Sequence, residues 1–403
     1  MTTTRIAAAL LVALLEAALW AWALGLMPRA VDGVRRRLYP LALAHLLAAV
    51  LFLGGGSAQA ARLLRGRAPE PFAAFTPSGD PGLARWMAAQ RPRLPRPDAA
   101  DPARLASWAE TMRAYLDTTA FRTPPPADPP IAGTPRLLER VRLAGGIERR
   151  FVSVPGFDGT AIPGYLFVPP GLARRPAVIV IPGHGEGIVE TAGLVDSYQH
   201  AVALRLAEAG FVTYTPELRG FGYLGGRIGT DHSAVAQNAQ LAGTSYKAVV
   251  LRDLRAVSAW MAAQPEVDTA RMGVSGVSYG GEMSVALAAM EPRFRAVVAQ
   301  GFEGGTGPLR PRTATEPMPF HGCHETLLAN RDLWQEDLFL LVSPRPMLMV
   351  TGSDDLPADP GLTDLLRGVY RAAGRPDGFQ SAVREGGHEY FAEPAIAFFR
   401  AHL

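Results

Sequence analysis

Short apolar runs alternate with longer amphipathic stretches from residue 149 to the C-terminus. Apolar runs of roughly four to eight residues are typical of buried strands, and apolar positions three and four apart are typical of helices. Strands are predicted at residues 151–154, 162–168, 177–181, 211–215, 271–275, 296–300, 347–351 and 379–384. Helices are predicted at residues 194–209, 246–263, 282–290, 361–373 and 392–403. Buried strands that alternate with helices predict the α/β class, with a doubly wound and mostly parallel sheet.

Two apolar runs within residues 1–60 indicate membrane or signal segments. Residues 6–27 form a run that is interrupted by Glu16 and is long enough to cross a bilayer, and residues 38–53 form a second run. In one interpretation both runs span the membrane as a hairpin, and the arginine-rich loop between them stays in the cytoplasm. In another, residues 38–53 are the apolar core of a signal peptide that is cleaved after Ala60. A buried soluble helix is the third interpretation, which the missing polar face disfavours.

Both favoured interpretations place the chain after Ala60 outside the cytoplasm, either tethered to the membrane or exported. Residues 61–135 are rich in proline, alanine and arginine, a composition typical of a linker. Short helices are predicted within it at 82–89 and 102–116, and Asp101 is the expected N-cap of the second. The chain is therefore expected to have three parts: membrane or signal segments (1–60), a linker with short helices (61–135) and a catalytic domain (136–403).

The composition argues against some classes of function but does not indicate a particular one. The 403 residues carry a formal net charge of +3, which is too small to argue for a nucleic-acid partner. Cys323 is the only cysteine, so no internal disulfide can form. Lys247 is the only lysine among 40 basic residues, an imbalance that fits codon bias better than function.

A serine motif carries the strongest chemical signal. Gly276-Val277-Ser278-Tyr279-Gly280 matches Gly-x-Ser-x-Gly and lies between a predicted strand and a predicted helix, which is the context of a nucleophile elbow. Such a turn exposes the serine hydroxyl at a helix N-terminus, where an oxyanion is favoured. Ser278 is therefore the candidate nucleophile. A glycine-rich turn without chemistry is the alternative, which the residues downstream disfavour.

An activated serine needs a base, and the base needs an acid that orients it. In this fold class the chain order is serine, acid, histidine. His388 follows a glycine pair after the last predicted strand and is the candidate base, with an exposed loop histidine as the alternative. Asp355, three residues after Gly352, is the candidate acid, and Asp354 is the second choice.

The oxyanion hole requires two convergent N–H donors. One is the backbone N–H of Tyr279, directly after the nucleophile. The other is expected from the glycine-rich loop after the strand at 177–181, where the N–H of His184 is the first choice. A role of the His184 side chain as a ligand or base is a less favoured alternative.

The segment His321-Gly322-Cys323-His324 suggests a metal site, because it holds three ligand types at close spacing. No second ligand pair lies nearby in the sequence, so we expect this segment to line the rim of the pocket instead. Segments 221–245 and 302–334 are expected to cap or rim the same pocket. No metal and no cofactor is expected.

Further motifs accompany the candidate triad. They are the turn Phe157-Asp158-Gly159, the loop Pro182-Gly183-His184-Gly185, the turn Pro216-Glu217-Leu218-Arg219-Gly220 and the segment Ser343-Pro344-Arg345-Pro346. With these motifs, residues 136–403 resemble the α/β-hydrolase superfamily, and more narrowly its dienelactone-hydrolase and acetyl-xylan-esterase-like branch.

The resemblance implies that Ser278, Asp355 and His388 are the triad and that His184 and Tyr279 supply the oxyanion donors. Pro182 and Glu217 depart from the branch, which usually has a histidine and an aspartate at these positions. The resemblance also implies that the substrate is a small-molecule or carbohydrate ester.

The predicted function is a serine hydrolase that cleaves carboxylic esters through an acyl-enzyme intermediate. An acyltransferase or a peptidase would use the same triad and is an alternative. A catalytically inactive, membrane-anchored binding module is an alternative from a different class.

Overall fold

The computed structural model describes residues 94–98, 100–122, 133–171, 173–225, 232–302, 335–355 and 359–403. The chain divides into two compact units, Met1–Ser78 and Gly79–Leu403, and every described residue belongs to the second. The apolar runs at 6–27 and 38–53 and the helix predicted at 82–89 lie outside the described residues. Within the described part of the chain, no helix is both long enough and apolar enough to cross a membrane.

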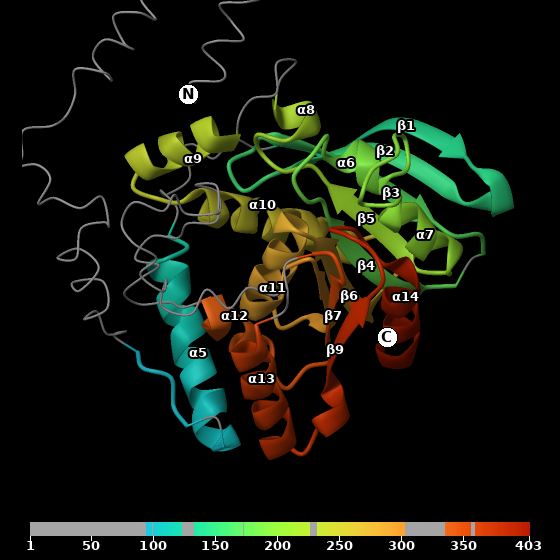
Figure 1. The fold of residues 1–403 in the computed structure, drawn as a ribbon. Coiled ribbons are helices and arrows are strands. Elements are labelled where there is room, and N and C mark those ends of the chain that lie inside the picture. Colours follow the sequence, from blue (N-terminus) through green and yellow to red (C-terminus); the bar gives the residue numbers. More distant parts are fainter. Residues whose placement is uncertain are drawn as a thin grey trace, which may run out of the picture. The chain divides into compact units, whose positions relative to one another are not determined.

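A nine-stranded sheet organises the described residues, with the strand order β1-β2-β3-β5-β4-β6-β7-β8-β9 (Figure 1). The pairs from β1 to β5 are antiparallel, and the five pairs from β5 to β9 are parallel. The predictions of the α/β class and of a mostly parallel sheet are confirmed. The strands are β1 Arg136–Arg142, β2 Glu148–Pro155, β3 Ala161–Val168, β4 Arg175–Ile181, β5 Val212–Pro216, β6 Val267–Val277, β7 Phe294–Gln300, β8 Met347–Gly352 and β9 Phe379–Arg384.

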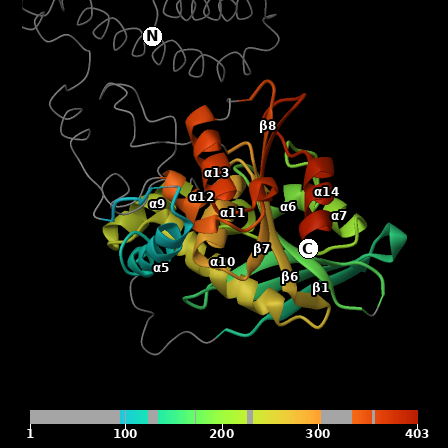
Figure 2. The same cartoon turned by 90° about the horizontal axis from the view of Figure 1, so that it is seen from below.

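Helices cover both faces of the sheet and make three layers (Figures 1 and 2). Helices α5, α10, α11, α12 and α13 pack on one face, and α6, α7 and α14 pack on the other. Helices α8 and α9 lie between β5 and α10 in the chain. The helices are α5 Pro102–Thr118, α6 Ile188–Thr191, α7 Val202–Glu208, α8 Gly222–Gly225, α9 His232–Leu241, α10 Tyr246–Ala262, α11 Tyr279–Met290, α12 Gln335–Val342, α13 Pro360–Ala372 and α14 Ala392–His402.

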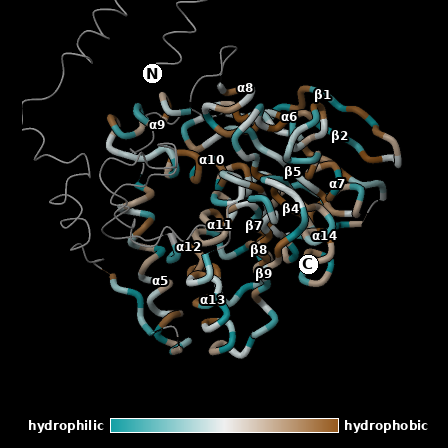
Figure 3. The backbone as a smooth tube through the Cα atoms, in the orientation of Figure 1, coloured by the Kyte–Doolittle hydropathy of each residue, from teal (hydrophilic) through white to brown (hydrophobic). Residues whose placement is uncertain are grey.

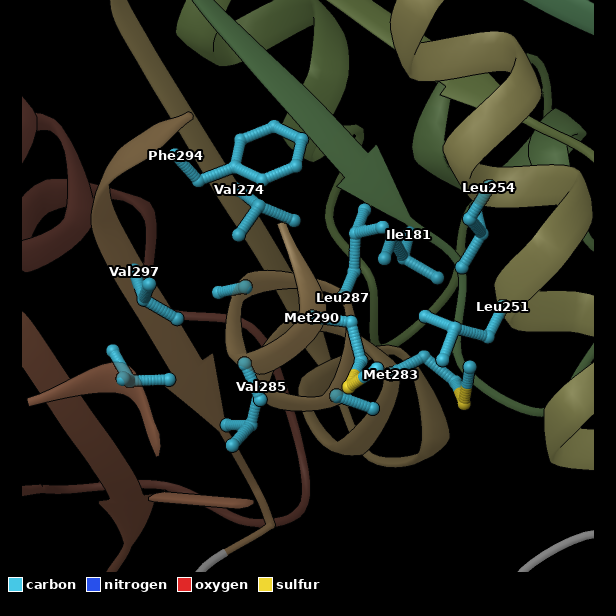
Figure 4. Close-up of a cluster of buried hydrophobic side chains, with 14 of the residues drawn as sticks. Ile181, Leu251, Leu254, Val274, Met283, Val285, Leu287, Met290, Phe294 and Val297 are labelled. Atoms are coloured by element: carbon cyan, nitrogen blue, oxygen red, sulfur yellow. The ribbon is translucent and has the colours of Figure 1, made fainter. Parts of the chain in front are cut away.

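The two faces of each central strand supply two separate hydrophobic cores. On β4, Ile179 and Ile181 belong to the larger core, whereas Val178 and Val180 belong to the smaller one on the opposite face. Because neighbouring strand residues point to opposite faces, a strand buried on both sides must be apolar throughout. Figure 3 gives the hydropathy of each residue along the chain, and Figure 4 shows part of the larger core, where α11 packs on β4 and β6.

The connections between the strands change direction at β4. The chain runs from β4 to β5 on one side of it and then returns to β6 on the other side. In open α/β sheets, ligands bind at such a point, beside the carboxyl ends of the strands. The carboxyl ends of β4 and β6 are Ile181 and Val277. Ser278, the residue that follows Val277, therefore lies at this point.

Helix α5 packs on one face of the sheet domain, although it lies within the stretch expected to be a linker. Asp101 caps the helix by accepting a hydrogen bond from the N–H of Arg104, as predicted. Arg113 crosses to the domain and donates to the carbonyl groups of Ala289 and Leu341. The residues of α5 in the larger core are Leu105, Trp108, Ala109, Met112 and Leu116.

The helix predicted at 194–209 is correct only in its second half. The helix α7 starts at Val202, after a loop in which His200 and Ala201 have φ angles of 48° and 52°. Such positive φ angles cannot belong to a right-handed helix. Strand β1 was not predicted because it is an exposed edge strand without a buried face, and helices α9 and α12 were also not predicted.

Candidate active site

Ser278 occupies the turn between β6 and α11 and has a strained backbone. Its φ and ψ angles are 60° and −128°, and such conformations of non-glycine residues cost about 1–3 kcal/mol. The Ser278 N–H donates to the carbonyl of Gln300 at 2.8 Å, and the Ser278 carbonyl accepts from the N–H of Glu282 at 3.1 Å. The serine is therefore held at the N-terminus of α11, where the helix dipole favours negative charge.

Gly280 allows the end of β4 to approach this turn closely. A Cβ atom at Gly280 would lie 2.1 Å from the Ile181 carbonyl oxygen, so a larger residue would push β4 and the turn apart. The loop after β4 consequently begins beside the serine. The rings of His184 in that loop and of Tyr279 at the start of α11 have centroids 5.2 Å apart. The two residues predicted to supply oxyanion donors are thus neighbours at the turn that holds Ser278, the candidate nucleophile.

His388 and Asp355 meet beyond the ends of β8 and β9. His388 Nδ1 lies 2.8 Å from Asp355 Oδ2, and the Asp355 side chain is 8% exposed. Asp354 instead accepts a hydrogen bond from Ser353 Oγ at 3.4 Å and is exposed. Of the two carboxylates considered from the sequence, Asp355 is the one in contact with the predicted base.

Backbone hydrogen bonds join the loop after β8 to the loop after β9. The N–H of Asp354 donates to the Gly386 carbonyl at 2.9 Å. The imidazole of His388 also lies against Gly301 at the end of β7. A Cβ atom built there would be 3.0 Å from His388 Cε1 and 3.2 Å from Val277 Cγ2. The structure thus brings His388 and Asp355 to the end of the sheet where Ser278 lies.

A cluster of rings beside the nucleophile turn was not predicted from the sequence. The ring of His184 lies 4.7 Å from that of His232 and 5.4 Å from that of Phe221. Phe221 stacks on Tyr279 at 6.0 Å. Phe221 and His232 come from segment 221–245, which was expected to rim the pocket, so these two residues form a wall next to the candidate nucleophile.

Tyr198 is a second neighbour that the sequence did not reveal. Its ring stacks on the His388 imidazole with centroids 5.5 Å apart, and its hydroxyl donates to the His184 carbonyl at 2.7 Å. The residue lies in the loop that was mistaken for a helix. Gly193 and the pair Asp196-Ser197 are turn-forming residues that indicate a loop there.

Glu217 is a buried carboxylate next to the loop after β4. Burial raises its pKa to about 7, and the negative charge of Glu190 adds to the shift. Hydrogen bonds from the backbone N–H groups of Ile188, Leu218 and Tyr223 act in the opposite direction. The carboxyl group therefore changes its charge near neutral pH while it holds three backbone segments around the site.

The metal hypothesis for the segment between His321 and His324 lies outside the described residues. Among the residues that the structure describes, no group of three or more histidine, cysteine, aspartate or glutamate side chains is arranged to hold a metal ion.

A parallel sheet flanked by helices, with a serine at a strained strand-to-helix turn, defines the α/β-hydrolase fold. Residues 162–316 match the dienelactone hydrolase family, so the resemblance to this branch is confirmed. No curated protein sequence matches the chain.

Solved structures with similar folds carry esterase names. A candidate acetyl xylan esterase from Bacteroides fragilis has a TM-score of 0.65 at 20% identity, and the match covers 78% of this chain and 83% of that one. A methylesterase has a TM-score of 0.53 at 18% identity, with coverage of 81% and 69%. A glucuronoyl esterase from Solibacter usitatus has a TM-score of 0.53 at 13% identity, with coverage of 73% and 91%. At these identities the likeness establishes the fold.

The raised pKa of Glu217 predicts a pH-dependent stability. The folded protein holds the carboxyl proton more tightly than the unfolded chain, so this stabilisation is complete below the ordinary pKa of 4.5 and is lost as the pH rises through about 7. The difference between the pKa values of the folded and unfolded states corresponds to about 3 kcal/mol in the free energy of unfolding. In denaturant unfolding at pH 5 and pH 8, Glu217→Gln should remove this part of the pH dependence. Glu186→Gln, at an exposed position of the same loop, should leave it in place, and an unchanged dependence in Glu217→Gln would contradict the assignment.

Proposed function

We propose that this chain is a serine hydrolase that cleaves carboxylic esters through a covalent acyl-enzyme. The observation that carries the proposal is the 2.8 Å contact between His388 and Asp355 at the end of the sheet where Ser278 lies. A nucleophile, a base and an orienting acid in one place are the minimum set for acyl transfer from an ester. The family match and the esterase names of the structural neighbours support a hydrolase of this type.

The first half of the reaction acylates the serine. Ser278 Oγ attacks the ester carbonyl while His388 takes the hydroxyl proton. Asp355 accepts the Nδ1 proton of His388, fixes the tautomer with a free Nε2 and stabilises the imidazolium that forms. The imidazolium then gives its proton to the leaving alcohol, and the acyl group remains on the serine.

The second half returns the free enzyme. His388 removes a proton from water, and the resulting hydroxide attacks the acyl-enzyme carbonyl. The imidazolium of His388 then returns its proton to Ser278 Oγ as the bond between this oxygen and the acyl group breaks, and the carboxylic acid leaves. In both halves the N–H groups of His184 and Tyr279 hold the negative oxygen of the tetrahedral intermediate. Each such donor contributes about 3 kcal/mol to the stability of the transition state. The N-terminus of α11 adds its partial positive charge at the same oxygen.

The substrate class follows from two arguments. The ring wall formed by His184, Phe221 and His232 offers flat faces that can carry a sugar or an acyl group. The names of the similar structures refer to a xylan acetyl ester, a methyl ester and a glucuronoyl ester. We therefore propose a small-molecule or carbohydrate ester as the substrate.

The catalytic unit acts outside the cytoplasm in this proposal. The arginine-rich loop between the two N-terminal apolar runs stays in the cytoplasm because positively charged loops resist translocation. The run at 38–53 then leads the rest of the chain across the membrane, whether or not a peptidase cuts after Ala60.

Ser278→Ala should abolish ester hydrolysis because no other described group occupies the nucleophile turn. A fluorophosphonate probe should label the wild-type protein at Ser278 and should not label the variant. Peptide mapping by mass spectrometry identifies the labelled residue. Labelling at another residue, or an active alanine variant, would reject the assignment.

The two neighbouring aspartates give a matched pair of variants. Asp355→Asn should lower the turnover number by roughly four orders of magnitude, because the amide favours the wrong tautomer of the base. Asp354→Asn changes the same atoms one residue away, where the side chain is exposed, and should lower turnover by less than about tenfold. Steady-state kinetics on an activated ester measures both. The reverse ranking would assign the acid to Asp354.

A reporter fused after Leu403 tests the location of the catalytic unit. Alkaline phosphatase, which is active only outside the cytoplasm, should be active in this fusion, and a cytoplasm-dependent fluorescent protein should be dark. Fluorescence without phosphatase activity would show that export is wrong. If the unit is exported, the N-terminal sequence of the purified protein separates a released enzyme that starts at residue 61 from a tethered one with an intact N-terminus.

A further inference from the structure

The segment Ser197–Ala201 connects two loops of the candidate active site that are far apart in the sequence. On one side it contacts the loop after β4, which begins at Pro182. On the other side it contacts the loop of His388. Both His200 and Ala201 have positive φ angles, and such strained residues persist only where surrounding contacts determine the backbone.

Two neighbouring side chains of this segment hold the peptide that contains the N–H of His184. Gln199 Oε1 accepts from the N–H of Gly183 at 2.8 Å, and the Tyr198 hydroxyl donates to the carbonyl of His184 at 2.7 Å. The peptide between Gly183 and His184 lies between these two anchors. Gln199 is fully buried and donates in turn to Glu190, so its own position is fixed.

The ring of the same tyrosine, Tyr198, packs against the imidazole of His388. Its ring stacks on that imidazole with an interplanar angle of 23°. Its carbonyl accepts from the N–H of Tyr390 at 2.8 Å, and the next pair along, His200 and Glu389, is joined by a side-chain hydrogen bond. Tyr198 is therefore tied through its backbone to the loop whose histidine it stacks on.

The Tyr198 hydroxyl also lies at the nucleophile. A Cβ atom at Gly183 would be 2.2 Å from this hydroxyl oxygen and 3.2 Å from Ser278 Cβ, so the hydroxyl and the serine lie on the same side of the loop after β4. Burial raises the pKa of Tyr198, so the phenol keeps its proton. That single proton is donated to the His184 carbonyl, so the hydroxyl holds the loop after β4 beside Ser278.

We propose that Tyr198 is a positioning residue for both halves of the catalytic centre: its hydroxyl fixes the His184 peptide beside Ser278, and its ring fixes His388. This inference rests on the proposed esterase function. The two roles reside in different atoms of one side chain, so different substitutions separate them.

The experiment compares Tyr198→Phe with Tyr198→Leu. The phenylalanine variant keeps the ring and loses only the hydroxyl. Removal of an oxyanion donor lowers turnover about 10²–10³-fold, and loosening such a donor should cost less, about tenfold. The Michaelis constant should stay within about twofold, and the midpoint of the acidic limb of kcat/KM against pH should not move. The leucine variant also removes the ring and should lose about a further tenfold in turnover.

Tyr370→Phe is the matched control. Tyr370 is fully buried and, like Tyr198, donates its hydroxyl proton to a backbone carbonyl, in this case that of Arg345, away from the candidate site. All turnover numbers are expressed per active site titrated with a fluorophosphonate, which corrects for misfolded protein. The control should keep its turnover per active site even if its melting temperature falls.

Each outcome decides the proposal. A Tyr198→Phe variant within twofold of wild-type turnover per titrated site would overturn it, as would an equal loss in Tyr370→Phe. A leucine variant equal to the phenylalanine variant would reject the role of the ring. Wild-type protein with neither ester turnover nor probe labelling would instead reject the proposed function itself.

Discussion

The close approach of the turn at Ser278 to the end of β4 is the constraint on which the geometry of the candidate active site depends. The Ile181 carbonyl lies where any side chain at residue 280 would have to be, so the turn is sharp and the strand ends directly against it. This contact fixes the start of the loop that carries His184 relative to the start of α11, which carries Tyr279. A looser turn would separate the two N–H groups that are proposed to bind the oxyanion together.

Backbone strain in the described residues is concentrated at this end of the molecule. Ser278, His200 and Ala201 are the non-glycine residues with positive φ angles within the described ranges. Each lies in the turn between β6 and α11 or in the segment Ser197–Ala201, which contacts the loop after β4 and the loop of His388. The two cores around the sheet supply the packing that holds such conformations, because central strands such as β4 are buried on both faces. Strain at the site is thus compensated by burial elsewhere in the domain.

The sequence predicted the regular parts of the fold well, for a physical reason. Helix α10 was predicted within one residue, because the core imposes a clear apolar period on it. Strand β9 was predicted at its observed bounds although only Phe379 in it is buried. The loop at 194–201 was predicted as a helix because its apolar residues continue the helical spacing of the residues that follow. Its tertiary contacts instead hold the backbone in a non-helical conformation. The contact between His388 and Asp355 followed a rule of chain order, whereas Tyr198 follows no such rule. Its proposed role depends on a stacking partner 190 residues away in the chain, and the local sequence pattern does not predict such long-range contacts.

The charges around the nucleophile turn obey a further requirement, which is that no uncompensated carboxylate should face the oxygen that becomes negative. Glu282 lies in the first turn of α11, one turn from Ser278, and forms an ion pair with Lys247 in which both side chains are almost completely buried. Glu217 meets the requirement differently, because its raised pKa lets it carry a proton near neutral pH. The compact ammonium of lysine fits an enclosed site beside one carboxylate, whereas the planar fork of arginine requires acceptors spread over a wider area. The only lysine of this chain therefore lies where a compact cation is needed beside one buried carboxylate.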